Sequence, residues 1–304
     1  MSNVEEKYIV LYIEGGLGKN IAATALIRPI KKKYPDRKLI IVASWAELFL
    51  NDPDLYRVYA AGNTPYFYEN YIKDKDTIVF RKEPYNENSH IMREKTLMKT
   101  WLDMYDLEYS EDDISPMIFM NYIQKAGINK WKRNKPVMLI HTNGGPFDPK
   151  ANMNDFSWTR DMPPMFADEI AKLASRDYHV IQVCKENSFQ LPNVEILNGK
   201  LNMFDLFCLL LSSEKRLLID SCLQHAAAAF KLPSTVLWNG TSPEMFGYNI
   251  HDNIESEKNN GKSLLLESFL FDYDFNGIPY QCPYSEQKDT FDLGKIIKSL
   301  QLKL

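Results

Sequence analysis

Apolar residues recur along the chain in two alternating patterns, as short continuous runs and as longer stretches with helical spacing. Runs such as YIVLYI and LIIVA are bounded by glycine or polar turns, which is typical of strands buried on both faces of a parallel sheet. Apolar residues at three-to-four spacing between the runs predict helices. The predicted strands are Tyr8–Ile13, Leu39–Ala43, Tyr56–Ala60, Thr77–Phe80, Val137–His141, His179–Cys184, Val194–Leu197, Arg216–Asp220 and Ser234–Trp238. The predicted helices are Asn20–Tyr34, Ala46–Leu50, Ile91–Tyr105, Pro164–Ser175, Met203–Ser212, Leu223–Phe230 and Phe291–Leu302.

This alternation predicts an α/β protein whose parallel sheets are covered by helices on both faces. The pattern restarts after a polar segment, 123–136, which is rich in lysine, asparagine and arginine and ends in Lys135-Pro136. We therefore expect two Rossmann-like domains, 1–133 and 134–304, facing a central cleft. A length of 304 residues fits two domains of about 150 residues each.

Composition narrows the class of protein. The formal net charge of −4 argues against a globally basic nucleic-acid binder, although the basic run Lys31–Lys38 leaves a local contact with an anion open. No apolar run approaches the roughly 20 residues of a membrane span, and Met1–Lys7 is too polar for a signal peptide. The four cysteines are widely separated, which indicates reduced thiols rather than a zinc site or a disulfide framework. We therefore expect a cytoplasmic protein without a membrane span.

Ligands of such sheets bind beyond the carboxyl ends of the strands, where this chain has several glycine-rich or polar turns. The first turn joins a strand to a helix, so its backbone N–H groups predict a contact with phosphate or sugar-phosphate, with a plain tight turn as the alternative. Ile13 and Ile21 stand where a P-loop and a dinucleotide fingerprint would need glycine, so neither motif is complete. The residues of this turn are Gly15, Gly16, Gly18, Lys19 and Asn20.

The segment DSCLQHAAAA, residues 220–229, carries the strongest chemical signal. A strand ends in Asp220, and an alanine-rich helix follows with Ser221 placed to cap it and His225 in its first turns. An acid, an imidazole and unpaired helix N–H groups then meet at one strand end, where an anion can bind. The alternative is structural, with Asp220 as a cap and His225 packed in the core.

The stretch from Asp220 to Gly247 resembles the donor motif of heptosyltransferase-like glycosyltransferases, which form glycosyltransferase family nine. That motif runs Asp-Ser/Thr-Gly-x-x-His-x-Ala-Ala-Ala, then a strand led by proline, then Gly-x-Thr-x-Pro. The segments GGLGKNIAATALIRPIKKKYPDRKLIIV, FSWTRDMPPMFADEIAKLASRDYHVIQV and GKLNMFDLFCLLLSSEKRLLIDS resemble further parts of the family. The resemblance spans most of the chain, with gaps around 63–90 and 245–285. It implies a GT-B fold with an N-terminal acceptor domain, a C-terminal nucleotide-sugar domain, and a last helix that can pack back on the N-terminal domain.

The same resemblance implies an inverting glycosyltransferase that needs neither a metal ion nor a cofactor. It would move a sugar from a nucleotide-sugar donor to a hydroxyl of a glycan, a lipid-linked sugar or another surface polymer. Positions that match the family motifs, or that could supply a missing charge beside them, are the expected donor contacts. They are Thr142, Asn143, Gly144, Arg160, Lys185, Glu186, Asp220, Ser221, Gln224, His225, Gly240 and Thr241.

The chain departs from the family pattern at the expected general base. Lys19 stands where the family carries an aspartate, and lysine takes a proton only if its pKa is strongly lowered. We therefore expect Glu14 or His90 to act as the base. Cys222 and Phe156 replace a glycine and a lysine of the motifs, which leaves the donor sugar and the acceptor open.

Three alternatives follow from these departures. A hydroxymethylated DNA base would serve as the acceptor of the same reaction, and the basic run 31–38 keeps that open. A nucleotide-sugar epimerase or hydrolase can use the same fold, because fold does not fix function. A non-catalytic protein that binds a sugar nucleotide is the third alternative, since the family base is absent.

Overall fold

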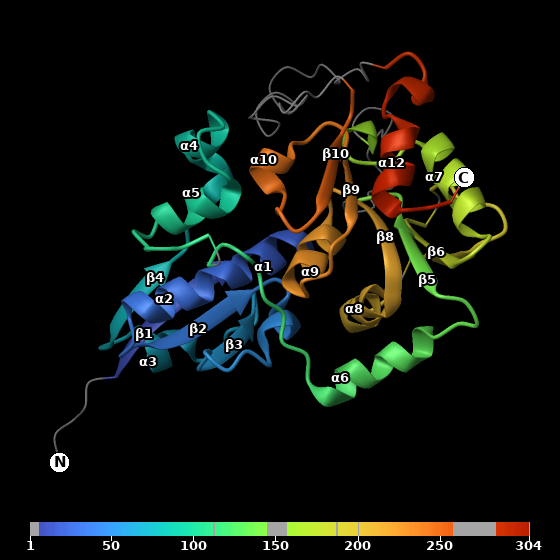
Figure 1. Ribbon diagram of the computed structural model, residues 1–304. Coiled ribbons are helices and arrows are strands. Elements are labelled where there is room, and N and C mark those ends of the chain that lie inside the picture. The colour runs from blue at the N-terminus through green and yellow to red at the C-terminus, as the bar shows by residue number, and fades with distance from the viewer. Residues whose placement is uncertain are drawn as a thin grey trace. The chain divides into compact units, whose positions relative to one another are not determined.

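The computed structural model describes residues 6–111, 113–144, 157–186, 188–199, 201–257 and 284–303. The chain is an α/β protein with two separate sheets, and every strand pair in both sheets is parallel (Figure 1). Contacts divide it into two compact units, Met1–Asn121 and Tyr122–Leu304. No helix in the described residues is long and apolar enough to cross a bilayer.

The division between the units falls after Asn121 rather than near residue 133. The segment 122–131 forms α6 (Tyr122–Ala126) and η4 (Gly127–Trp131), which pack on α8 (Met203–Ser212) of the second unit. Lys130 forms an ion pair with Asp205 at 2.9 Å, and the Cys208 thiol lies 3.1 Å from the Gln124 carbonyl oxygen. A polar composition suggested a linker, but these contacts attach the segment to the second unit.

The first unit holds a four-stranded sheet in the order β3-β2-β1-β4. Strand β1, one of its two central strands, is almost fully buried, as its continuous apolar sequence predicts. Aromatic residues of α3 (Phe67–Tyr71) pack on one face of this sheet, against side chains of β1 and β2. The strands are β1 (Lys7–Ile13), β2 (Lys38–Ala43), β3 (Arg57–Ala60) and β4 (Asp76–Phe80).

Two predicted helices of the first unit are divided. The expected helix 20–34 consists of α1 (Leu17–Ala23), the 3₁₀ turn η1 (Thr24–Leu26) and α2 (Ile27–Lys33), because Pro29 cannot continue the hydrogen-bond ladder of an α-helix. The expected helix 91–105 is two helices, α4 (Asn88–Ile91) and α5 (Leu97–Asp103). Thr96 caps α5 by accepting a hydrogen bond from the Lys99 backbone at 3.2 Å, so a new helix starts there. The remaining 3₁₀ turns are η2 (Ala46–Phe49) and η3 (Pro84–Asn86).

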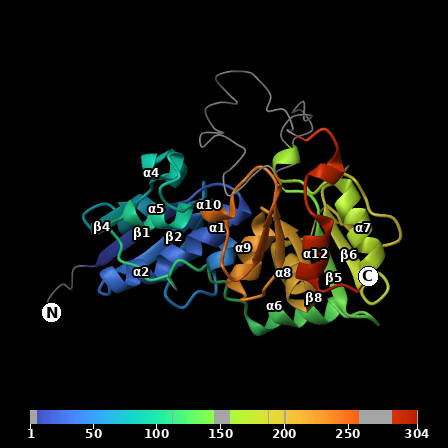
Figure 2. The same cartoon turned by 45° about the horizontal axis from the view of Figure 1, so that its top comes forward.

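The second unit holds a six-stranded sheet in the order β10-β9-β8-β5-β6-β7. Helices α7 and α12 pack on one face, and α8 and α9 lie on the other (Figure 1, Figure 2). The strands are β5 (Val137–His141), β6 (His179–Cys184), β7 (Glu195–Asn198), β8 (Ser213–Ile219), β9 (Thr235–Trp238) and β10 (Asp252–Glu255). The remaining helices are α7 (Pro164–Ala174), α9 (Cys222–Ala229), α10 (Pro243–Phe246) and α12 (Leu293–Leu300), with 3₁₀ turns η5 (Ser157–Thr159) and η6 (Gln287–Asp289).

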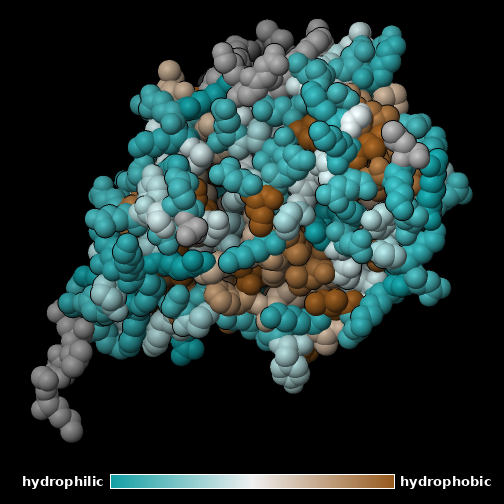
Figure 3. All heavy atoms as spheres, in the orientation of Figure 1, coloured by the Kyte–Doolittle hydropathy of each residue, from teal (hydrophilic) through white to brown (hydrophobic). Residues whose placement is uncertain are grey.

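The C-terminal part of the second unit adds two features that the sequence did not define. Strand β10 was not predicted, because it is a short, polar edge strand in which Ile254 is the buried side chain. Helix α12 was expected to be able to pack on the first unit, and in the structure Ile296, Ile297 and Leu300 are buried in the core of its own unit. Hydrophilic residues cover most of the visible face of the molecule (Figure 3).

Candidate functional site

The strand order of the second sheet gathers most of the predicted donor residues at one edge. Strand β8 lies between β9 and β5, and all three strands run parallel. Their carboxyl ends therefore place three turns side by side, 142–144, 220–222 and 239–241. Ordinary van der Waals distances confirm this for the first two turns, since a Cβ on Gly144 would lie 3.5 Å from the Asp220 carbonyl oxygen and 3.5 Å from the Ser221 Cβ.

The junction of β8 and α9 is built as the sequence predicts. Ser221 caps α9, its hydroxyl oxygen accepting a hydrogen bond from the Leu223 backbone at 3.4 Å. Asp220 is buried, and this burial raises the pKa of its carboxyl, while the charge of Arg160 and a hydrogen bond with Thr241 act in the opposite direction. A carboxyl, a hydroxyl and the N-terminus of an eight-residue helix thus meet at the strand end.

His141 belongs to this site although the sequence did not select it. It ends β5, and its Nδ1 lies 2.9 Å from the Ser221 hydroxyl oxygen. Burial lowers the pKa of His141 to about 4, so the ring is neutral at pH 7. Its position at the carboxyl end of a predicted strand was the available signal, but a histidine inside an apolar run is usually structural.

The segment 158–162, which we call the strap, connects the two outer turns of the site. At one end the Gly240 N–H donates to the Thr159 carbonyl at 2.6 Å, and at the other the Met162 N–H donates to the Thr142 carbonyl at 2.9 Å. A Cβ on Gly240 would lie 2.9 Å from the Thr159 Cα, so the two backbones touch. The strap carries Arg160, the predicted positive charge. Phe156, which precedes it, lies outside the described residues.

A carboxylate of the strap occupies the turn 142–144. Asp161 accepts one hydrogen bond from the Gly144 N–H at 3.0 Å and another from the Asn143 side-chain amide at 2.9 Å. The Thr142 hydroxyl in turn donates to the Asn143 side-chain oxygen at 2.9 Å and accepts from the Gln182 amide at 2.9 Å. Asp161 was not selected from the sequence, because its partners Asn143 and Gly144 are 18 and 17 residues away along the chain.

A pocket of about 280 Å³ opens beside the same turn, at the ends of β5 and β6. Lys185 and Glu186, two of the expected donor contacts, are part of its wall. The complete lining is His141, Asn143, Val183, Cys184, Lys185, Glu186 and Gly199. The pocket combines a cation and a carboxylate with apolar side chains, which suits a nucleoside.

Gln224 and His225 are engaged in contacts within the second unit. The Gln224 amide donates to the Phe246 carbonyl at 3.1 Å, and His225 Nδ1 lies 2.8 Å from the Tyr248 hydroxyl. His251 adds a contact of 2.9 Å to the Gln224 carbonyl. Burial lowers the pKa of His225 to about 3. A role of Gln224 and His225 in donor binding therefore stays a prediction.

The glycine turn of the first unit is stabilised from within. Gly15 has a φ of 114°, which favours glycine, and its N–H donates to the Ser44 hydroxyl at 3.1 Å. The amide of the fully buried Asn20 donates to the Gly15 and Gly16 carbonyls at 3.2 and 2.9 Å. The Asn20 side chain thus stabilises the turn and is not accessible to solvent. Gly18, the last glycine of the turn, lies inside α1.

Lys19 already has an anionic partner, Glu83, with which it forms an ion pair. Its ammonium also lies 5.6 Å from the ring centres of Tyr85 and of Trp101. The side chain of Lys19 is 13% exposed, so its ammonium group is largely enclosed by Glu83 and the two aromatic rings. Sequence reasoning missed Glu83, because it follows β4 and is distant from the turn in sequence.

The two candidate bases have opposite environments. Glu14 is exposed and forms an ion pair with Arg81 at 2.9 Å. His90 is buried, with its ring edge-on to Tyr85 at 5.5 Å, and burial lowers its pKa to about 4. Glu14 is therefore open to an acceptor, whereas His90 is shielded from solvent.

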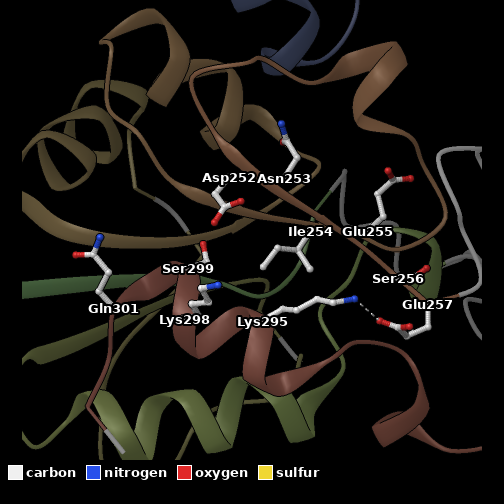
Figure 4. A pocket seen from close by; sticks show the side chains of 10 residues that line it. All are labelled: Asp252, Asn253, Ile254, Glu255, Ser256, Glu257, Lys295, Lys298, Ser299 and Gln301. Atoms are coloured by element: carbon white, nitrogen blue, oxygen red, sulfur yellow. Dashed lines mark hydrogen bonds and ion pairs between the residues drawn. The ribbon is translucent and has the colours of Figure 1, made fainter.

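A larger hollow of about 610 Å³ lies between β10 and α12 (Figure 4). Its wall has mixed charge, including an ion pair between Lys295 and Glu257 at 3.2 Å, and contains no predicted site residue. Within the described residues, no group of three histidine, cysteine, aspartate or glutamate side chains could hold a metal ion.

Known structures resemble the chain over nearly its whole length. A family 9 glycosyl transferase from Veillonella parvula has a TM-score of 0.65 at 10% identity, covering 98% of this chain and 97% of that one. The ADP-heptose lipopolysaccharide heptosyltransferase II of Escherichia coli has a TM-score of 0.63 at 14% identity, with coverages of 97% and 98%. This chain has the GT-B fold of family nine glycosyltransferases. The E. coli heptosyltransferase WaaC with ADP gives a TM-score of 0.54 at 14% identity, covering 83% of this chain and 94% of that one.

The low identities mark a divergent sequence with the family nine fold. No protein-family model matches the sequence, and no curated protein matches it either. The likeness therefore rests on the arrangement of the strands and helices. It bears out the fold that the donor motif and glycine turn predicted, and it leaves the chemistry to be argued from the residues.

Proposed function

We propose that this protein is a glycosyltransferase that moves a sugar from a nucleotide-sugar donor to a hydroxyl acceptor. The observation that carries the proposal is the junction of β8 and α9, where Asp220, Ser221 and a helix N-terminus meet at the strand end expected to bind the donor. The neighbouring pocket at Lys185 and Glu186 suits the nucleoside. WaaC, which has the same fold, forms a complex with ADP, which supports a nucleoside diphosphate here.

The donor site supplies what the departing diphosphate needs. As the bond between the sugar and the phosphate oxygen breaks, negative charge grows on the diphosphate. The helix N–H groups of α9 and the side chains of Arg160 and Lys185 would stabilise this charge. These two cations perform the task for which other enzymes use a metal ion, so we propose a metal-independent reaction.

On the acceptor side we propose a single displacement with inversion. An acceptor hydroxyl attacks the anomeric carbon opposite the diphosphate and loses its proton to a carboxylate. Glu14 of the first unit suits this step better than His90, because Glu14 is exposed and His90 is shielded by burial. The acceptor class that we propose is a glycan, a lipid-linked sugar or another surface polymer. Three described cysteines are free thiols, which supports a cytoplasmic location.

Thermal stabilisation by a panel of nucleoside diphosphates and nucleotide sugars, with and without EDTA, tests the donor proposal. A ligand that binds only the folded protein raises its melting temperature with concentration. We expect one nucleotide to give a shift that EDTA leaves unchanged. Incubation with the matching nucleotide sugar and no acceptor then separates transfer from epimerisation or hydrolysis, because only the latter two change the sugar without an acceptor. The donor proposal fails if no compound of the panel stabilises the protein.

Arg160→Ala tests the site itself. Loss of a charged contact to the diphosphate should weaken binding of the stabilising nucleotide by about 10- to 100-fold, because hydrogen bonds to charged groups contribute about 1.5–3 kcal/mol. Arg176→Ala is the matched control, since Arg176 is exposed beyond the end of α7. Equal affinities of the two variants would show that Arg160 does not contact the donor.

A further inference from the structure

The turn 142–144 is an anion site that is already filled by the protein. Its two outward donors, the Gly144 N–H and the Asn143 amide, both point to the carboxylate of Asp161, at 3.0 and 2.9 Å. A backbone N–H, a side-chain amide and nearby cations are the groups that bind a phosphate oxygen. Asp161 therefore takes the place that an external phosphate would need.

The charges around Asp161 support this interpretation. Burial raises the pKa of the Asp161 carboxyl. The hydrogen bonds from Asn143 and Gly144 favour its ionised form, and so do the positive charges of Lys185 and Arg160. Both of these cations are residues that we assign to the diphosphate. A diphosphate at the β8–α9 junction and the Asp161 carboxylate thus compete for the same cations, and they repel each other.

The strap keeps Asp161 in this position. Backbone hydrogen bonds hold it on both sides, from Gly240 to Thr159 and from Met162 to Thr142. Thr159 and Met162 are buried, at 4% and 3% exposed. The position of the Asp161 carboxylate is therefore fixed by the fold, because the backbone is held by hydrogen bonds at Thr159, two residues before Asp161, and at Met162, one residue after it.

We propose that Asp161 is a specificity-determining residue, an internal anion that excludes phosphate from the turn 142–144 and limits the affinity of the site for the diphosphate group. This inference rests on the proposed donor site. The diphosphate is then confined to Ser221 and the start of α9. Thr142, Asn143 and Gly144 support the site through Asp161 and do not touch the diphosphate themselves, which departs from the prediction made for them.

The change D161N separates charge from shape. The variant keeps a side-chain oxygen for the Gly144 N–H, and the Asn143 amide can turn over to meet the new NH₂ group. Calorimetric titration with inorganic pyrophosphate, ADP and adenosine measures the effect on the anion and on the nucleoside separately. We expect D161N to bind pyrophosphate and ADP about tenfold more tightly than the wild type, since one repulsive charge is removed close to the anion, and to bind adenosine equally.

Two further variants complete the experiment. D177N removes one negative charge from the exposed surface after α7 and should leave all three affinities unchanged. D161A removes the charge together with both hydrogen bonds, and it should tighten pyrophosphate binding in the same direction if D161N does not fold.

The outcomes separate this inference from the proposed function. Unchanged or weaker pyrophosphate binding by D161N, or an equal gain in D177N, overturns the role of Asp161, even when the wild type binds a nucleotide. Failure of wild type and variants alike to bind pyrophosphate overturns it too. The proposed donor site itself is decided by the nucleotide panel on the wild-type protein.

Discussion

The closest backbone approach in the candidate site is between Gly240 and the strap, and it gives a sharp test of the structure. In Gly240→Ala, the new methyl group would lie 2.9 Å from the Thr159 Cα, 2.9 Å from its Cβ and 3.0 Å from its carbonyl oxygen. Two of these three atoms are backbone, so a simple rotamer change cannot relieve the clash. Either the turn or the strap must move.

The cost follows from this geometry. Inserting a methyl group into a packed site costs about 1–3 kcal/mol. The same movement weakens the 2.6 Å hydrogen bond from the Gly240 N–H to the Thr159 carbonyl, which contributes about 0.5–1.5 kcal/mol. We therefore expect Gly240→Ala to lower the free energy of unfolding by about 2–4 kcal/mol, measured by urea denaturation followed by circular dichroism. A displaced strap also moves Arg160, so nucleotide affinity should fall.

Gly144→Ala is the matched control, because Gly144 lies on the other side of the strap in the same unit. A methyl group there would meet its neighbours at 3.5 Å, which is ordinary contact. We expect this variant to change stability by less than about 1 kcal/mol. Equal stability losses in the two variants, or a neutral Gly240→Ala, would show that the strap does not touch the 239–240 turn.

Two more predictions concern charge. Lys19→Met leaves the Glu83 carboxylate without its cation and should lower the free energy of unfolding, measured by urea denaturation, by about 1–2 kcal/mol. Adding Glu83→Leu should recover part of this loss. If the losses of the two single variants simply add in the double variant, the pairing is refuted. Acidification from pH 7 to 5 should destabilise the second unit, because desolvation lowers the pKa values of three of its histidines to about 4, 3 and 4. In the unfolded chain these histidines take up protons below about pH 6.5, so the free energy of unfolding decreases as the pH falls. The raised pKa of Asp220 has the opposite effect and offsets part of this decrease. A constant urea midpoint would contradict this. The histidines are His141, His225 and His251.

The parallel sheets could be predicted from the sequence because their central strands are continuous apolar runs. Strand β10 could not, since one buried isoleucine in a polar edge strand gives no periodic signal. The broken helices have a related cause. Apolar spacing continues through 91–105, but the cap at Thr96 and the left-handed backbone of Arg93, with a φ of 55°, start a new helix. Spacing of apolar residues predicts the buried face, and single polar side chains decide where an element ends.

In the candidate site, too, the sequence predicts the features that depend on a local pattern and misses those that depend on contacts between distant residues. The turns at 142–144, 220–222 and 239–241 were predicted, because each follows a recognisable strand. Asp161 and His141 were missed, because their importance comes from contacts to residues distant in sequence, Gly144 and Ser221. The contact of His141 depends on the strand order, in which β8 lies beside β5, and that of Asp161 on the path of the chain between β5 and α7; no local pattern contains either.

The glycine turn of the first unit shows how such contacts can reverse a conclusion about charge. By sequence, the turn has a cation at Lys19 where family nine has an acid, so it was expected to bind a negative group. The structure supplies that negative group from the protein itself, since Glu83 follows β4, the strand next to β1. The Lys19 charge is neutralised and enclosed by two aromatic rings, and a carboxylate stands beside the turn after all. A charged residue at the end of one strand therefore predicts a bound ligand only when the residues at the ends of the neighbouring strands are known. A side chain from one of those strands can itself be the counter-ion.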